Sequence, residues 1–397
     1  MKKFLVLMVA LCLGLSGAIG QEARAAAKEP YVIGVPLDLS GPAAFLGTPI
    51  ERVIKMRAEE INKAGGVNGR ELKLVVLDNE SAPAKTVLNT KKLINVDKVV
   101  ACLGYTTSGS TLAAIETAQS GETVLYSHAS SDKIWIPTKK WVFNTTPRTM
   151  EACTPQMIDN LLKRGAKKIA YLYIDNAMGQ TGLEAFNAYV QKIGIKPAII
   201  EKYEPAATDV SPQITHIKNS GADGLFIDGL AADAALALKT ARELGIKFPI
   251  NCGYGVVGPE FIKLASKHGE GVLTTSLRAL VAKELPDSDP QKKIAVDLYE
   301  KYTKAFGAFS LYAGHGWDSI SITTQALAKV DPTLDPAKEE DLKKIRAQLR
   351  DAIEGTKNFL GQNGIFNYSP DNHNGLPPGC YVPVVVQNGE WRLYKGK

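Results

Sequence analysis

Two stretches decide the fold of this 397-residue chain: Ile33-Gly-Val-Pro-Leu-Asp-Leu-Ser-Gly-Pro-Ala-Ala-Phe-Leu-Gly47 and Glu60-Ile-Asn-Lys-Ala-Gly-Gly-Val-Asn-Gly-Arg70. The apolar run Tyr31–Val35 predicts a short buried strand. Thr48 is a candidate N-cap with Pro49 at the first helical position, and Gly65-Gly66 is a helix end. Apolar residues recur at helical spacing between these signals, at Ile50, Val53, Ile54, Ala58 and Ile61. The region is therefore a strand followed by a helix.

The same unit repeats along the chain in two blocks, separated near Pro147. The first block predicts strands at Glu71–Leu77, Val99–Leu103 and Thr123–Ser127, and helices at Pro83–Asn95 and Gly109–Gln119. The second predicts strands at Lys168–Ile174, Pro197–Tyr203, Gly224–Asp228, Phe248–Cys252 and Gly271–Thr275, and helices at Gln180–Ile193, Ser211–Asn219, Ala231–Leu244 and Pro259–Lys267. Strands that alternate with helices form parallel sheets covered on both faces. The predicted fold class is therefore α/β, with two doubly wound, Rossmann-like lobes.

The last third of the chain has a different pattern. Residues 285–355 are charged, with candidate helices at Asp289–Phe306, Trp317–Lys329 and Ala337–Glu354. The tail from Ile365 to Tyr394 is β-like, and Asn388-Gly389 is a hairpin signal.

The N-terminus has the layout of a secretory signal peptide. Lys2 and Lys3 precede an uncharged run from Phe4 to Gly20, and small residues around Ala25 offer cleavage sites. We expect residues 1–25 to be removed and the mature protein to be periplasmic. The formal net charge of +6 is too small to require nucleic acid or an anionic membrane as a partner.

Four cysteines remain after cleavage: Cys102, Cys153, Cys252 and Cys380. They show no metal-ligand or redox spacing. An exported protein can form disulfides, so both paired cysteines and buried free thiols are open, and the sequence does not choose among the pairings.

The ends of the predicted strands locate a ligand site. In open α/β sheets, ligands bind outside the carboxyl ends of the strands. One such loop, Gly104–Gly109, carries Tyr105 and three hydroxyls, from Thr106, Thr107 and Ser108, directly before a helix. A helix N-terminus with free N–H groups suits a carboxylate. Capping of the helix explains one hydroxyl but not three, so we predict ligand contact there.

Several stretches of the sequence resemble a known family. The two opening stretches, together with Val99–Gly109, Asp209–Asp223 and Asp371-Asn-His-Asn-Gly375, are similar to the leucine/isoleucine/valine-binding proteins, the type I periplasmic binding proteins of ABC importers. The resemblance implies two lobes joined by three crossovers, with lobe one at residues 28–146 and 276–357 and lobe two at 147–275 and 358–397. It also implies a non-enzymatic, cofactor-free monomer that delivers a small solute to a membrane permease.

The resemblance also implies ligand residues. Thr106, Thr107, Ser108, Ala129 and Ser131 stand where such proteins hold the α-carboxylate and α-ammonium, and Met178, Leu230 and Tyr254 stand at the lobe-two positions. The acidic residue expected at Tyr254 is absent, and a buried ammonium without a carboxylate is costly. Asp175, Asp228 and Asp233 are candidate substitutes. Together with Phe45 and Leu46, these positions predict an apolar site for an amino acid or an aliphatic or aromatic acid.

Three other interpretations remain. Gly253-Tyr-Gly-Val-Val-Gly258 matches a dinucleotide fingerprint, but no acidic residue ends the next predicted strand, which argues against an NAD-dependent oxidoreductase. A ligand sensor of the same fold is the second. The third concerns His128, which lies at the predicted site and is either a ligand contact or a core histidine.

Overall fold

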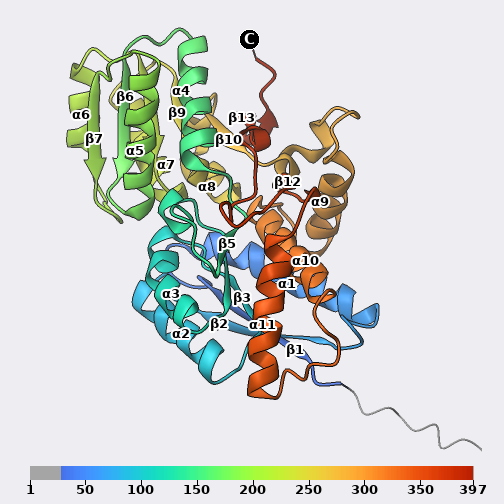
Figure 1. The fold of residues 1–397 in the computed structure, drawn as a ribbon. Coiled ribbons are helices and arrows are strands. Elements are labelled where there is room, and N and C mark those ends of the chain that lie inside the picture. The colour runs from blue at the N-terminus through green and yellow to red at the C-terminus, as the bar shows by residue number, and fades with distance from the viewer. Residues whose placement is uncertain (1–27, 397) are drawn as a thin grey trace, which may run out of the picture.

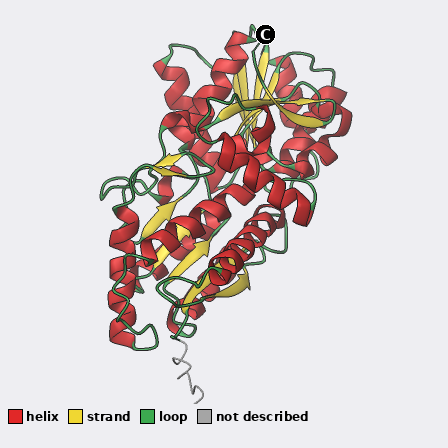
Figure 2. Cartoon of the chain, turned by 90° about the vertical axis from the view of Figure 1, so that its right-hand side faces the viewer, coloured by secondary structure: helices red, strands yellow, loops and turns green. Residues whose placement is uncertain are grey.

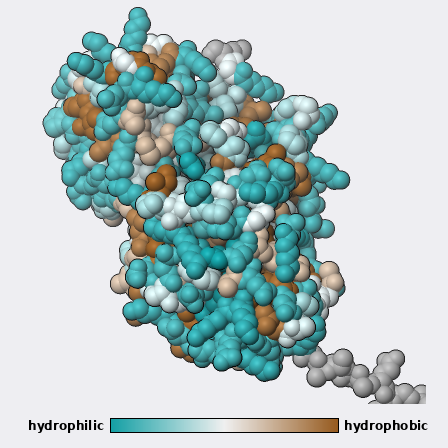
Figure 3. Space-filling view, in the orientation of Figure 1, coloured by the Kyte–Doolittle hydropathy of each residue, from teal (hydrophilic) through white to brown (hydrophobic). Residues whose placement is uncertain are grey.

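The computed structural model describes residues 28–396, which form two lobes, one above the other in Figure 1. The predicted signal peptide, residues 1–25, lies outside the described residues. Each lobe contains a sheet with helices on both of its faces, visible as two separate sets of strands in Figure 2. Hydrophilic residues cover most of the face shown in Figure 3. The α/β two-lobed fold is as predicted.

Lobe one is built on a parallel sheet with the strand order β2-β1-β3-β4-β5. Its strands are β1 (Tyr31–Leu37), β2 (Leu72–Asp78), β3 (Ala101–Gly104), β4 (Val124–Ser127) and β5 (Val142–Asn144). Its helices are α1 (Ala44–Lys63), α2 (Pro83–Asn95), α3 (Ser108–Ser120), α10 (Tyr312–Leu327) and α11 (Glu339–Glu354). The central strands β3 and β4 are buried on both faces, as expected for a covered parallel sheet.

Lobe two repeats this topology and extends it. Its sheet has the order β14-β13-β10-β9-β8-β6-β7, in which β13 and β14 are antiparallel. The strands are β6 (Ile169–Ile174), β7 (Ile199–Tyr203), β8 (Gly224–Asp228), β9 (Ile250–Cys252), β10 (Leu273–Ser276), β13 (Val382–Gln387) and β14 (Glu390–Leu393). The helices are α4 (Thr154–Lys163), α5 (Ala177–Lys192), α6 (Ser211–Asn219), α7 (Ala231–Glu243) and α8 (Pro259–Ala265). The hairpin predicted at Asn388-Gly389 joins β13 to β14.

The chain crosses between the lobes three times. The first crossing contains the π-helical turn η2 (Thr149–Cys153), and the second contains η5 (Arg278–Glu284) and α9 (Lys292–Phe306). The third contains β11 (Phe359–Leu360), β12 (Ile365–Phe366) and η6 (Pro378–Cys380). The remaining short helices are η1 (Asp132–Ile134), η3 (Tyr254–Val256) and η4 (Ser266–Gly269).

The third crossing packs on lobe one before it reaches the second sheet. The Tyr368 hydroxyl donates to the Asn144 carbonyl over 3.0 Å, and His373 stacks on Phe143 with ring centroids 4.1 Å apart. The two side-chain oxygens of Asp318 in α10 accept the backbone N–H groups of Gln362 (2.7 Å) and Asn363 (2.9 Å). Burial raises the Asp318 pKa to about 8.

Helix α1 begins earlier than its cap and proline signals predicted. Its first residue is Ala44, so Thr48 is not the N-cap and Pro49 lies inside the helix. The extra turn packs tightly on β1, since a Cβ added to Gly47 would stand 2.0 Å from the Asp38 carbonyl oxygen. Because only glycine permits so close an approach of two backbones, the helix can begin one turn before the predicted start signal. The sequence pattern also did not predict β5 and α4.

Two further features concern the chain as described. Cys102, Cys153, Cys252 and Cys380 are buried free thiols, so no disulfide forms among them. None of the helices within residues 28–396 has both the length and the hydrophobicity needed to cross a membrane.

Candidate functional site

A cavity of about 650 Å³ lies between the two lobes. This volume is within the roughly 300–1,000 Å³ typical of small-molecule sites. Lobe one contributes loops at the carboxyl ends of β1, β3 and β4, and lobe two those of β6, β8 and β9. The cavity therefore lies where parallel sheets bind ligands.

Ten of the twelve predicted site residues line this cavity. They are Phe45, Leu46, Thr106, Thr107, Ser108, His128, Ala129, Met178, Leu230 and Tyr254. They come from both lobes, so the fold brings together side chains more than 200 positions apart in the sequence.

Tyr105 and Ser131 do not line the cavity. Tyr105 has a φ of 64°, is fully buried, and its hydroxyl lies 3.1 Å from Thr90 Oγ1 in the core of lobe one. Ser131 Oγ lies 2.6 Å from Thr181 Oγ1 of α5, which makes Ser131 a contact between the lobes. Tyr105 therefore packs in the core of lobe one and Ser131 contacts α5, and neither lies in the cavity where it was predicted.

The start of α3 forms the polar end of the cavity. Thr107 is the N-cap, and its hydroxyl oxygen accepts from the Ser110 N–H over 3.4 Å. The Ser108 hydroxyl oxygen accepts from the Ser131 N–H over 3.2 Å. Because each oxygen already accepts a hydrogen bond, its own proton remains to donate to a ligand. The helix N-terminus adds positive potential at the same place, which suits a carboxylate.

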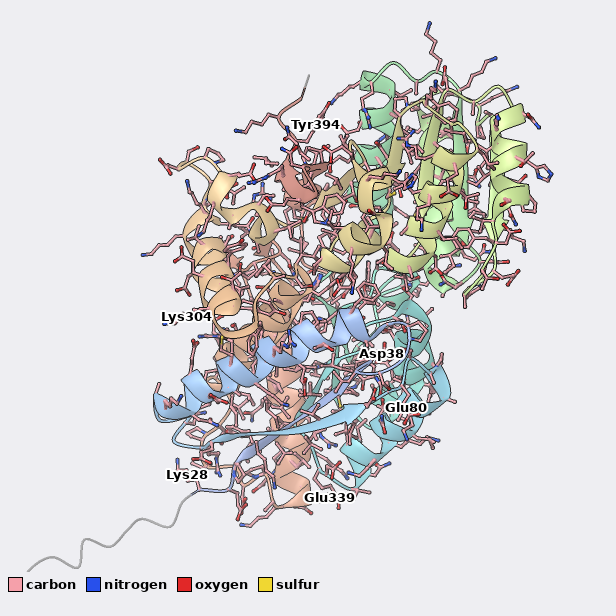
Figure 4. All side chains as sticks on the ribbon, turned by 180° about the vertical axis from the view of Figure 1, so that it is seen from behind. Lys28, Asp38, Glu80, Lys304, Glu339 and Tyr394 are labelled. Atoms are coloured by element: carbon pink, nitrogen blue, oxygen red, sulfur yellow. The ribbon has the colours of Figure 1, made fainter. Side chains whose placement is uncertain are left out.

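Thr106 is oriented differently. Its hydroxyl donates to the buried carboxylate of Asp38, at the end of β1, so it offers the cavity only lone pairs. Burial is the main cause that raises the Asp38 pKa. Figure 4 shows Asp38 beside the part of α1 that is nearest lobe two.

His128 has partners for both ring nitrogens. Nδ1 lies 2.8 Å from Thr145 Oγ1, and Nε2 lies 3.5 Å from Ser319 Oγ. Burial and the neighbouring His315 hold the His128 pKa well below its usual range, so the ring is neutral. Its contribution to the site is shape and polarity rather than charge.

The wall from lobe two is mainly apolar. Ile174, Met178 and Leu230 line it, and two carboxylates, Asp233 and Glu260, lie in the first turns of α7 and α8. Burial raises the pKa of both carboxyls, and Glu260 Oε2 has no hydrogen-bond partner among the described residues.

The other two acidic candidates lie away from the cavity. Asp228 accepts from the Tyr171 hydroxyl over 2.9 Å, and Asp175 pairs with Lys202 at 2.6 Å. Of the three substitutes weighed from the sequence, only Asp233 lines the cavity.

Sequence reasoning missed several lining residues. Glu260 stands at the start of a helix that follows the glycine-rich loop, and Tyr312 belongs to α10, which returns to lobe one after the second crossing. The acidic residue two positions after Gly258 was a readable signal for Glu260. Tyr312 had none, because nothing local shows where the returning helix docks.

The glycine-rich loop has a packing role. Tyr254–Val256 forms the turn η3, and a Cβ on Gly253 would stand 2.3 Å from Asp228 Oδ1. Within residues 28–396, no group of His, Cys, Asp or Glu is arranged to hold a metal ion.

Comparisons with known proteins agree with this geometry. The family model described as "Periplasmic binding protein" matches residues 30–390. An amino acid binding protein of Pseudomonas aeruginosa is 29% identical over 270 residues, which cover 67% of this chain and 71% of that protein. A leucine-, isoleucine-, valine-, threonine-, and alanine-binding protein of the same organism is 26% identical, over 86% of this chain and 89% of its own length.

A solved structure shares the whole architecture. The extracellular ligand-binding receptor from Rhodopseudomonas palustris HaA2 superposes with a TM-score of 0.83 at 28% identity, covering 92% of this chain and 99% of that one. These relatives are binding proteins and not enzymes, and the matched model spans both lobes and the cavity between them. The chain therefore belongs to the periplasmic binding protein family.

Proposed function

We propose that this protein is the extracytoplasmic solute-binding component of an ABC importer of the branched-chain amino acid type. It captures a small carboxylate-bearing solute, an amino acid or an apolar or aromatic acid, and delivers it to a permease in the inner membrane. The observation that carries the proposal is a cavity between two lobes with a polar end at one helix N-terminus and apolar walls elsewhere.

The polar end supports the carboxylate. Thr107 and Ser108 each have a hydroxyl proton available, and both stand at the start of α3, where the first backbone N–H groups of a helix lack partners within the helix. A charged acceptor gains about 1.5–3 kcal/mol from each hydrogen bond of this kind.

The remaining walls support an apolar body. Phe45, Leu46, Met178 and Leu230 line the cavity, and Phe45 packs edge-on against Tyr312 with ring centroids 5.9 Å apart. Burying an aliphatic or aromatic body against these side chains contributes roughly 25 cal/mol per Å² of apolar surface. The names of the Pseudomonas relatives, which include amino acids, support a solute of this size.

Thermal-shift screening tests the solute class. The panel consists of aliphatic and aromatic amino acids, the corresponding 2-oxo acids, the corresponding unsubstituted carboxylic acids, and their amides. A carboxylate at a hundred times its dissociation constant should add about 2.7 kcal/mol to the stability. Stabilisation by amides but by none of the carboxylates would contradict the proposal.

Uptake of the identified solute tests the transport role. Cells that lack the protein should take up the radiolabelled solute at a strongly reduced rate, and a plasmid copy should restore it. Unchanged uptake together with a solute-dependent change in gene expression would favour the sensor interpretation.

A further inference from the structure

A buried chain of hydrogen bonds runs behind the cavity wall. It connects His128, Thr145, His315 and Tyr254: His128 Nδ1 lies 2.8 Å from Thr145 Oγ1, which lies 3.0 Å from His315 Nδ1. His315 Nε2 lies 2.9 Å from the Tyr254 hydroxyl oxygen. Two of its members, His128 and Tyr254, line the cavity, while His315 is fully buried on α10.

Asn363 fixes the protonation of His315. The Asn363 amide nitrogen donates to the Thr145 carbonyl over 3.0 Å and lies 2.8 Å from His315 Nδ1. The opposite orientation of the amide would place two oxygen acceptors 3.0 Å apart. The amide therefore donates to His315 Nδ1, which must carry a lone pair.

The ring is neutral, since its full burial opposes a positive charge. Its single proton is then on Nε2, and Nε2–H donates to Tyr254. Tyr254 accepts this bond, so its own proton is not used by His315.

The Tyr254 proton has no acceptor among the described residues. The residue is 7% exposed and lines the cavity beside Leu230 and Tyr312. A buried hydroxyl that lacks an acceptor costs free energy until a ligand supplies one. A solute bound in the cavity that Tyr254 lines can supply this acceptor.

We propose that Tyr254 is a specificity-determining residue that selects a solute carrying a hydrogen-bond acceptor, a carbonyl or hydroxyl oxygen, in addition to its carboxylate. An ammonium at this point would meet the Tyr254 proton and be disfavoured. This inference rests on the proposed function, and it narrows the solute to carboxylates such as 2-oxo acids, in preference to the matching amino acids.

Matched pairs of probes test it by calorimetry: leucine against 4-methyl-2-oxopentanoate, and phenylalanine against phenylpyruvate. The wild-type protein should bind the 2-oxo acid of at least one pair about tenfold tighter than the amino acid, the effect of one hydrogen bond. Tyr254→Phe should remove this preference, so that the 2-oxo acid and the amino acid of a pair bind with closely similar affinities. Tighter binding of the amino acids, or an unchanged preference in Tyr254→Phe, would overturn the inference.

A ligand-independent measurement guards against a variant that fails to fold. The ¹⁵N shifts of the His315 ring in the wild-type protein should show the neutral Nε2–H form, and the Nδ1–H form would also overturn the inference. Failure of every carboxylate to bind would overturn the proposed function itself, whereas binding without the acceptor preference would overturn only the role of Tyr254.

Discussion

The two walls of the cavity differ in the kind of polar groups that they carry and in where these groups lie. The lobe-one wall concentrates hydroxyls at the start of one helix, and each is held by a hydrogen bond to the backbone or to Asp38. The lobe-two wall is mostly apolar, with carboxylates at the starts of α7 and α8. In the proposed function, the lobe-one wall binds the carboxylate, and the lobe-two wall selects the rest of the solute by its shape and polarity.

The first prediction breaks the lobe-one wall itself. Gly47→Ala should cost about 3 kcal/mol of unfolding free energy, because the new Cβ would meet the Asp38 backbone oxygen at 2.0 Å. Gly109→Ala is the matched control on α3, where the nearest atom is Pro83 Cγ at 3.8 Å. Chemical denaturation without ligand should show the loss only in Gly47→Ala. Equal stabilities would show that α1 can shift without cost.

A second variant tests the polar end alone. Ser108→Ala should weaken binding of the best carboxylate by about 2 kcal/mol, roughly thirtyfold, because a charged acceptor loses a donor. Ser110→Ala is its control, since Ser110 is buried on the same helix and does not line the cavity. Calorimetry compares the two. An unchanged affinity in Ser108→Ala would show that the carboxylate does not bind at the start of α3.

The connection between the lobes gives a pH prediction. The folded Asp318 pKa of about 8 lies above the usual value of 3.8, so the folded state holds a proton that the unfolded state releases. Stability from this group is present at low pH and is lost as pH rises toward 8, by at most about 1.4 kcal/mol per pH unit.

Between pH 6.5 and 7.5, the wild type should therefore lose stability relative to Asp318→Asn by up to that amount. Asp287→Asn, at a side chain that is 99% exposed, is the control and should run parallel to wild type. Denaturation at several pH values measures the difference. If the free energy of unfolding of Asp318→Asn changes with pH in parallel with that of the wild type, Asp318 is ionised in the folded protein.

The smallest expected effect concerns the charge of Glu260 on the lobe-two wall. Glu260→Gln should tighten binding of an apolar carboxylate by about 0.5 kcal/mol, because a like charge near the ligand is removed. Glu284→Gln is the control, since Glu284 lies outside the cavity. If Glu260→Gln instead weakens amino acids and spares 2-oxo acids, Glu260 holds an ammonium.

The regular parts of the fold could be predicted from the sequence. The bounds of α2, α6 and β8 match their predictions, because proline, glycine and apolar periodicity act locally. The start of α1 could not be predicted, because it depends on the close packing of Gly47 against the Asp38 carbonyl oxygen, which the local helix signals do not encode.

The candidate site divides in the same way. The loops at the strand ends followed from the general topology of parallel sheets. The inward turn of Tyr105 depends on one backbone angle, and the position of Tyr312 depends on where a helix docks after crossing between lobes. Neither leaves a trace in the spacing of residues.

Each of the two sheets contains a buried free thiol whose reaction rate can report local opening of its lobe. Cys102 lies in β3 of lobe one and Cys252 in β9 of lobe two, and both are almost inaccessible to solvent. Burial raises the pKa of both thiols, so neither reacts with an alkylating reagent until its strand opens. The alkylation rates of Cys102 and Cys252 in the intact protein therefore show which lobe undergoes local unfolding more readily.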